Sequence, residues 1–81
     1  MRIAVAAFAG LRELLAGSAS ELELPAGACV GDAWSALERR HPDLARLAPS
    51  TRLARNGRLA AADDPLSDGD ELALLPPVGG G

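Results

Sequence analysis

The sequence has no lysine, one cysteine, one histidine and two aromatic residues. Cys29 and His41 are too few to form an intrachain disulfide or a zinc site of the usual sulfur and nitrogen ligands, so no metal site is expected. Proteins that bind single-stranded nucleic acid stack the bases on several aromatic rings in a positive groove, whereas this chain has only Phe8 and Trp34 and a formal net charge of -3. We therefore do not expect nucleic acid as a partner.

Long hydrophobic runs are also missing from the sequence. None approaches the roughly 18 apolar residues that a membrane-spanning helix needs. The short apolar run at 3–9 is not followed by the small-residue cleavage pattern of a signal peptide. Together with the unpaired Cys29, these absences predict a cytoplasmic protein that does not bind a membrane. Since all eight basic residues are arginine, the amino group of Met1 is the only primary amine in the chain.

The 81 residues suffice for one small domain, and their first half predicts two strands and two helices. Residues 3–8 are apolar on both faces, which predicts a central strand. The strict alternation of glutamate and leucine at 21–24 predicts a second strand, antiparallel to the first. Leucines at helical spacing predict a short helix at 11–17. A stronger period of i, i+3, i+4 and i+7 predicts the main helix from Val30, and Pro42 ends it.

The second half of the sequence predicts a hairpin and a final strand. Two leucines three residues apart at 43–49 indicate a single helical turn. Asn-Gly at 56–57, between the short runs of 53–60, is typical of a tight hairpin turn. The final strand, 71–75, is apolar enough to lie beside the first strand at the centre of the sheet, as a parallel pair. This order predicts an α+β, β-grasp fold, with a mixed sheet and one main helix on one face.

The predicted elements also define a core and a domain boundary. We expect the domain to cover residues 1–77 and a flexible glycine tail to cover 78–81. Stability is expected to come chiefly from apolar side chains that the strands and the main helix turn inward. These are Ile3, Val5, Phe8, Leu22, Leu24, Trp34, Leu37, Leu53, Leu72 and Leu74.

Few side chains suit catalysis. The lone His41 lies at the end of the main helix, where it is expected to cap carbonyl groups. The carboxylates of the acidic segment 63–71 lack the spacing of a calcium loop and are interpreted as turn residues. Cys29, at the expected start of the main helix, is either an activated nucleophile or a small substitute for threonine at the N-cap. The second interpretation is favoured because the sequence offers no neighbouring residue to assist a nucleophile.

The strongest candidate for function is the chain end. Gly79, Gly80 and Gly81 carry no side chains, so this segment could pass through a channel too narrow for any Cβ. Ordering it costs about 1 to 2 kcal/mol per backbone residue, which a partner must offset with backbone hydrogen bonds. Apolar groups beside an inserted tail suit a partner surface, and Leu74 is assigned to it although it cannot also be wholly buried in the core. The full set expected to dock is Leu74, Leu75, Pro77 and Val78.

The segment 68–81 (DGDELALLPPVGGG) resembles the C-terminal signature of the small subunits of molybdopterin synthase, the MoaD-type sulfur carriers. The segments 11–14 (LREL) and 65–66 (PL) look like the same family, so the resemblance spans essentially the whole chain. The family pattern ends in Pro-Pro-Val, one variable residue and Gly-Gly. Gly79 therefore matches the variable position, and residues 80–81 match the functional pair.

The resemblance implies a ubiquitin-like fold and a defined chemistry. An adenylating enzyme, similar to ubiquitin-activating enzymes, would use ATP to convert the Gly81 carboxylate into an acyl adenylate, and a sulfur donor would turn it into a thiocarboxylate. The tail would then enter the large subunit of molybdopterin synthase, so this chain would bring sulfur, bind no cofactor itself and leave catalysis to its partner. Related carriers for thiamin, cysteine or other thio-metabolites, and ubiquitin-like protein modifiers, need the same activated carboxylate and remain alternatives.

Overall fold

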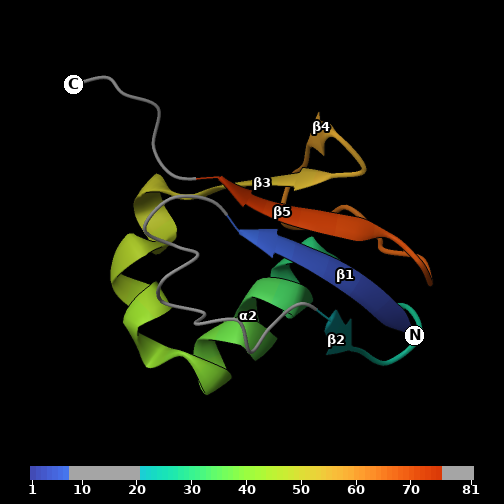
Figure 1. Cartoon of the computed structure of the whole chain (residues 1–81), viewed down its shortest axis with the longest axis horizontal. Helices are drawn as coiled ribbons and strands as arrows, with labels where there is room; N and C mark the ends of the chain where they lie inside the picture. Colours follow the sequence, from blue (N-terminus) through green and yellow to red (C-terminus); the bar gives the residue numbers. More distant parts are fainter. Residues whose placement is uncertain (8–20, 76–81) are drawn as a thin grey trace.

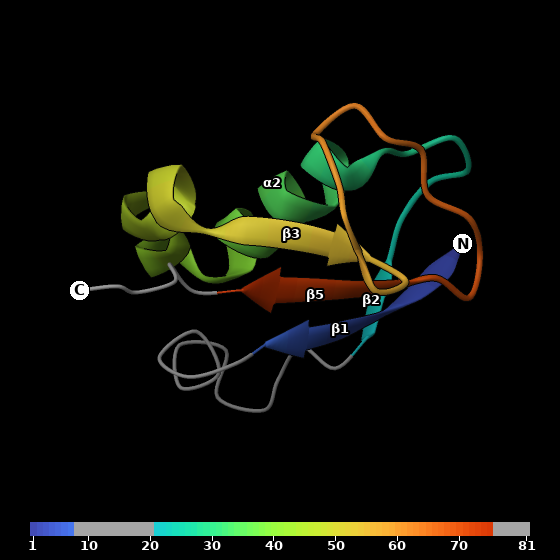
Figure 2. The same ribbon diagram turned by 90° about the horizontal axis from the view of Figure 1, so that it is seen from above.

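The computed structural model describes residues 1–7 and 21–75 (Figure 1). In this part of the chain a mixed sheet has the strand order β2-β1-β5-β3-β4. An α-helix and a 3₁₀ helix lie together on one face of the sheet (Figure 2). The elements in chain order are β1 (Arg2–Ala7), β2 (Glu21–Glu23), α2 (Val30–Arg40), η1 (Pro42–Ser50), β3 (Arg52–Arg55), β4 (Arg58–Leu59) and β5 (Glu71–Leu75). This is the β-grasp arrangement that the sequence predicts.

The strand pairing confirms the predicted topology. β1 runs antiparallel to β2 and parallel to β5, and Val5 lies opposite Leu72 in the parallel pair. β5 is also antiparallel to β3, so the last strand of the chain lies in the middle of the sheet with a bonded neighbour on each side. Figures 1 and 2 show that β5 ends on the side of the molecule away from the N-terminus.

Two elements differ from the prediction, and two predictions are not tested. The expected single turn at 43–49 is a longer 3₁₀ helix, Pro42–Ser50, whose Leu44 is fully buried. β2 ends at Glu23, one residue earlier than expected, although the backbone N–H of Leu24 still donates to the carbonyl oxygen of Met1 at 2.8 Å. The expected helix at 11–17 and Phe8 lie outside the described residues.

The main helix begins with a cap made by a cysteine. Cys29 is the N-cap residue of α2; its backbone N–H donates to the Asp32 carboxylate at 2.9 Å, and its thiol donates to the same oxygen at 3.3 Å. These two hydrogen bonds, the backbone one first, lower the pKa of Asp32 from its ordinary value. At the other end the backbone N–H of His41 donates to the Leu37 carbonyl oxygen at 2.8 Å. Both residues therefore contribute to the ends of the helix.

The core lies between the sheet and the helices. Seven of the predicted core residues are buried, namely Ile3, Val5, Leu22, Leu24, Leu37, Leu72 and Leu74. Trp34 and Leu53 pack against this core from a partly buried position, so they lie at its edge and not at its centre. For Trp34 the physical reason is its indole N–H, which donates to Glu38 at 2.7 Å and keeps that edge of the ring at the surface.

The hairpin between β3 and β4 turns at Asn56 and Gly57, as predicted. Both residues have a positive φ, 49° and 85°, which is the backbone of the tight turn that fits the twist of two strands. Replacing Gly57 with alanine is expected to lower the free energy of unfolding by about 1 kcal/mol, because a Cβ at this φ strains the backbone although it meets no atom within 4 Å. Urea unfolding measures the loss, and Gly57→Asn should cost less because asparagine tolerates this φ. Equal losses in the two variants would contradict the argument.

Candidate functional site

The described part of the candidate site is the end of β5, from which the predicted tail continues. Leu74 of β5 lies opposite Ala7 of β1, and Leu75 lies opposite Arg52 of β3. β5 is paired with β1 up to Leu74 and with β3 up to Leu75, so the predicted tail follows directly after a strand that is paired in the middle of the sheet. The predicted docking residues Pro77 and Val78, and the predicted glycines Gly79, Gly80 and Gly81, lie outside the described residues.

Leu74 and Leu75 have different environments. Leu74 has no exposed surface and belongs to the hydrophobic core. Successive side chains of a strand point to opposite faces, so Leu75 lies on the other face of the sheet, where it is half-buried. The expected docking role of Leu74 is not compatible with this burial, because a partner could reach its side chain only by opening the core. Of the two leucines, Leu75 is the candidate for contact with a partner.

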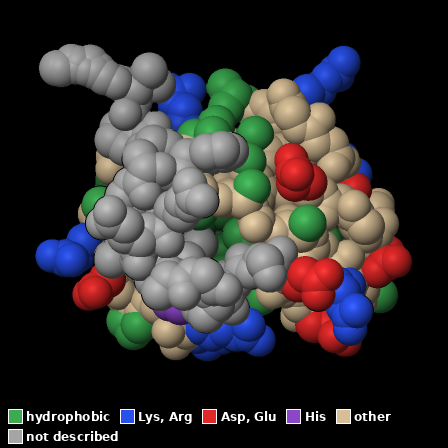
Figure 3. Space-filling model, viewed as in Figure 1, with side chains coloured by type: hydrophobic (Ala, Val, Ile, Leu, Met, Phe, Trp, Pro, Cys, Tyr) green, Lys and Arg blue, Asp and Glu red, His purple; other side chains and the backbone are tan. Residues whose placement is uncertain are grey.

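On the face of the sheet opposite α2, three alanines and one leucine lie side by side. The strand register places Ala6, Ala73, Ala54 and Leu59 in one row across four strands. Ala54 is buried but does not belong to the core cluster, and Leu59 is 63% exposed, as expected for residues on the outer face. In the part of this face that Figure 3 leaves visible, hydrophobic side chains lie next to acidic and basic ones. Leu75, the last described residue before the predicted tail, therefore adjoins a partly apolar surface.

Asp70 is the most strongly perturbed titratable group of the described chain. Its carboxylate accepts hydrogen bonds from the Asn56 amide at 3.0 Å, the Arg55 guanidinium at 2.7 Å and the Ser67 backbone N–H at 2.7 Å. These donors, Asn56 first, lower its pKa from 3.8 to about 2. Since Asp70 precedes the start of β5, whereas the tail follows its end, the cluster has a structural role. The sequence pattern indicated only a turn at Asp70, and no signal in it pointed to this cluster.

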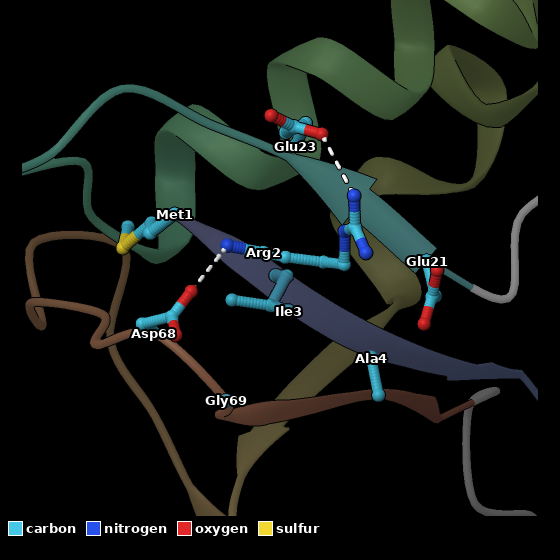
Figure 4. Close-up of a pocket in the computed structure, with 8 residues that line it drawn as sticks. All are labelled: Met1, Arg2, Ile3, Ala4, Glu21, Glu23, Asp68 and Gly69. Atoms are coloured by element: carbon cyan, nitrogen blue, oxygen red, sulfur yellow. Dashed lines mark hydrogen bonds and ion pairs between the residues drawn. The ribbon is translucent and has the colours of Figure 1, made fainter.

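An open hollow of about 500 Å³ lies beside the start of β1 (Figure 4), whereas the predicted tail follows the end of β5. Across it the Arg2 backbone N–H donates to Asp68 at 2.7 Å, and the Arg2 guanidinium donates to Glu23 at 3.4 Å. The hollow contains neither a histidine nor a cysteine to act as a nucleophile or base. Its lining residues are Met1, Arg2, Ile3, Ala4, Glu21, Glu23, Asp68 and Gly69. This hollow therefore does not form a catalytic constellation.

Residues 1–7 and 21–75 also contain neither a metal-binding cluster nor a membrane-spanning helix. No group of three or more His, Cys, Asp or Glu side chains in these ranges is placed to hold a metal ion. None of the helices described in them is both long enough and apolar enough to cross a membrane. The described side chains thus assemble no catalytic or metal centre, and the candidate site is reduced to the base of the tail and the sheet face beside it.

Comparison with known proteins assigns the family. The model of the ThiS family matches residues 5–81 of this chain. The chain belongs to the ThiS family. The match spans nearly all of the chain and agrees with the β-grasp arrangement of its strands.

Relatives of this ThiS family member differ in their named roles. It is 38% identical to small archaeal modifier protein 1 of Haloferax volcanii, with 91% of this chain and 94% of the relative covered. A crystal structure of that modifier matches with a TM-score of 0.87 at 35% identity over the whole of both chains. The molybdopterin synthase sulfur carrier subunit of Chlamydomonas reinhardtii is 34% identical over the whole of both chains.

A solved complex of subunits 1 and 2 of the molybdopterin-converting factor from Helicobacter pylori 26695 is also similar to this ThiS family member. The TM-score is 0.67 at 27% identity, and the match covers the whole of this chain and the whole of the matched chain. That protein with the same fold thus assembles with a second subunit. Relatives of this chain therefore include a modifier, a sulfur carrier and a subunit of a complex, and the resemblance to the MoaD-type carriers is confirmed. This ThiS family member is a ubiquitin-like sulfur carrier of the MoaD/ThiS type.

Proposed function

We propose that this chain carries sulfur as a thiocarboxylate on Gly81 and delivers it in the synthesis of molybdopterin. The observation that carries the proposal is the Gly-Gly end at residues 80–81 in a chain that matches a molybdopterin synthase sulfur carrier subunit along its whole length. The unpaired Cys29 and the composition are consistent with action in the cytoplasm. The partners expected are an adenylating enzyme, a sulfur donor and the large subunit of molybdopterin synthase.

The proposed chemistry takes place at the carboxylate of Gly81. A carboxylate oxygen is a very poor leaving group, so direct replacement by sulfur does not proceed. In an adenylating partner the carboxylate attacks the α-phosphate of ATP and releases pyrophosphate, which converts that oxygen into part of a good leaving group. Sulfide from the donor then attacks the carbonyl carbon, the bond from this carbon to the AMP oxygen breaks, and the products are the thiocarboxylate, AMP and a proton. We expect Leu75, the last residue of β5, and the sheet face beside it to contact the partner and so to position the tail there.

Intact-mass measurement tests this proposal. The chain is purified from its own host and from a host strain without the adenylating enzyme. In the first sample we expect the mass change of one oxygen replaced by sulfur, located at Gly81 by fragmentation, and in the second an unchanged carboxylate. Copurification with a larger, pterin-binding subunit then assigns the pathway. An unmodified Gly81 carboxylate in cells that contain the complete pathway would contradict the proposal.

Protein modification is the second candidate function. It is favoured by the 38% identity to small archaeal modifier protein 1, which exceeds the 34% identity to the sulfur carrier subunit. A modifier forms an amide between Gly81 and a lysine of another protein, and this bond survives both denaturation and thiols. Denaturing electrophoresis of host extracts under reducing conditions therefore separates the two functions. A ladder of larger species that carry this chain supports modification, and a single unconjugated band supports sulfur transfer alone.

Leu75 gives a prediction about docking. Replacing Leu75 with alanine is expected to weaken binding to the large subunit by about tenfold, because a half-buried leucine beside an inserted tail loses its apolar contact area with the partner. Titration calorimetry with the purified large subunit measures the change. Arg58→Ala, on the exposed strand β4, is the control and should bind within about twofold of the wild type. Unchanged binding of the Leu75 variant would place the docking surface elsewhere.

A further inference from the structure

An activated Gly81 carboxylate reacts with primary amines, so the number of primary amines in this chain decides whether one copy can be joined to another. The sequence contains eight arginines and no lysine. A guanidinium stays protonated in proteins and offers no free nitrogen lone pair for attack on a carbonyl carbon. The α-amino group of Met1 is therefore the only primary amine that a copy of this chain could offer to an activated carboxylate.

The structure engages this one amine. The amino group of Met1 donates a hydrogen bond to the carbonyl oxygen of Leu24 at 2.7 Å, and the backbone N–H of Leu24 donates to the carbonyl oxygen of Met1 at 2.8 Å. Met1 is half-buried and packs against the core. Figure 4 shows Met1 at the start of β1, beside the hollow and close to the charged side chains that line it. Attack by this amine requires the paired contact to open and the nitrogen to lose a proton.

The tail of the same copy is poorly placed to reach this amine. The start of β1 lies beside the start of β5, whereas the tail continues from the end of β5. Because Ala7 lies opposite Leu74 in the parallel pair, Met1 lies seven strand positions before the level of Leu75, which corresponds to about 23 Å at the rise of a parallel strand. The segment 76–81 spans at most about 21 Å when fully extended, and it would also have to reverse direction. Closure of the chain on itself is therefore opposed by geometry.

The thiol of Cys29 does not give the chain a second stable acceptor for an activated Gly81. It is half-buried and donates to the Asp32 carboxylate at 3.3 Å. An acyl group transferred to this sulfur would form a thioester, which free thiols cleave. To stay on this chain as a stable amide, the acyl group would have to move from the sulfur to an amine of the same chain, and the sequence provides no lysine for this purpose.

From these observations we infer that the chain donates its C-terminus to other molecules but does not accept one. Each acceptor site then carries a single copy, and two copies of this chain do not become joined by an amide bond. The inference rests on the proposed activation of Gly81. In the transfer, an amine nitrogen of another molecule bonds to the Gly81 carbonyl carbon, the bond from this carbon to AMP or to a thiol breaks, and the amine releases one proton to solvent.

A synthetic thioester of the tail tests the inference without the natural activating enzyme. The peptide Val-Gly-Gly-Gly, with an aromatic thiol as leaving group, is added in excess to the folded full chain and to the same chain in urea. Intact mass and peptide mapping after treatment with thiol locate the amide bonds. We expect Met1 of the folded chain to be acylated at least about tenfold more slowly than in urea, the factor that corresponds to 1.4 kcal/mol of protection. No other thiol-resistant adduct is expected.

Arg58→Lys is the matched variant, because Arg58 is exposed on β4. Its new amine should be acylated as quickly in the folded chain as in urea, which shows that the assay detects an accessible acceptor. Acylation of Met1 at equal rates in the folded and unfolded wild type would overturn the inference. Since the probe is already activated, either result is independent of whether Gly81 is activated in the cell.

Discussion

Deletion of Gly81 is expected to abolish thiocarboxylate formation, with a loss of at least about a hundredfold in sulfur transfer, while the unfolding midpoint stays that of the wild type. The reacting group is the carboxylate of the last residue, and shortening the chain withdraws it by about 3.5 Å from the position that the adenylating enzyme holds. Misplacement of a reacting atom by even 1 Å can cost about a hundredfold in rate. Within the described residues the buried core runs from Ile3 to Leu74, so we expect the deletion to leave its packing unchanged. Thiocarboxylate formation is measured by intact mass and stability by urea unfolding.

Two further variants separate the position of the carboxylate from the space around it. Addition of one glycine after Gly81 keeps the local chemistry but moves the carboxylate, and it should be as inactive as the deletion. Gly81→Ala keeps the position and adds one methyl group, so it reports how narrow the partner's channel is. Full activity of the extended chain would show that the position of the terminal carboxylate does not matter, and it would contradict the proposed function.

The sequence predicted the elements whose signals are local. Asn56 and Gly57 predicted a tight turn because few residues tolerate positive φ, and both adopt it. The alternation around Leu22 predicted a strand with one buried face, and Leu22 is buried. The central parallel pair of β1 and β5 followed from strands that are apolar on both faces, although the whole chain separates them.

The details that could not be predicted depend on contacts between distant segments. The alternation within β5 shows that Leu74 and Leu75 point to opposite faces, but only the tertiary structure shows that the face of Leu74 is covered by the helices. Trp34 has the spacing of a core residue, and a hydrogen bond to Glu38 keeps part of it at the surface. In the acidic segment, nothing local distinguished Asp70 from the exposed Asp68.

Asp70 gives the second prediction with a large effect. Asp70→Asn is expected to lower the free energy of unfolding at neutral pH by about 2 to 3 kcal/mol. All three partners of the carboxylate, from Asn56, Arg55 and Ser67, are hydrogen-bond donors. An amide offers one acceptor oxygen and turns its NH₂ group toward a donor, so at least one partner loses its bond. The loss spreads because Asn56 also exchanges two hydrogen bonds of 2.9 Å with Glu71, the first residue of β5. Urea unfolding with matched m-values measures the difference.

The pH dependence identifies the cause of this loss. Because the pKa of Asp70 falls from 3.8 to about 2 on folding, its charge stabilises the native state fully above the higher value and loses this contribution as the pH falls through the lower one. The stability difference between wild type and Asp70→Asn should therefore be constant near neutral pH and shrink between pH 3.8 and about 2. Asp68→Asn is the control: Asp68 is exposed and accepts one backbone hydrogen bond from Arg2, so its loss should stay below about 1 kcal/mol. A difference for Asp70→Asn that does not change with pH would mean that the carboxylate acts through its shape and not through its charge.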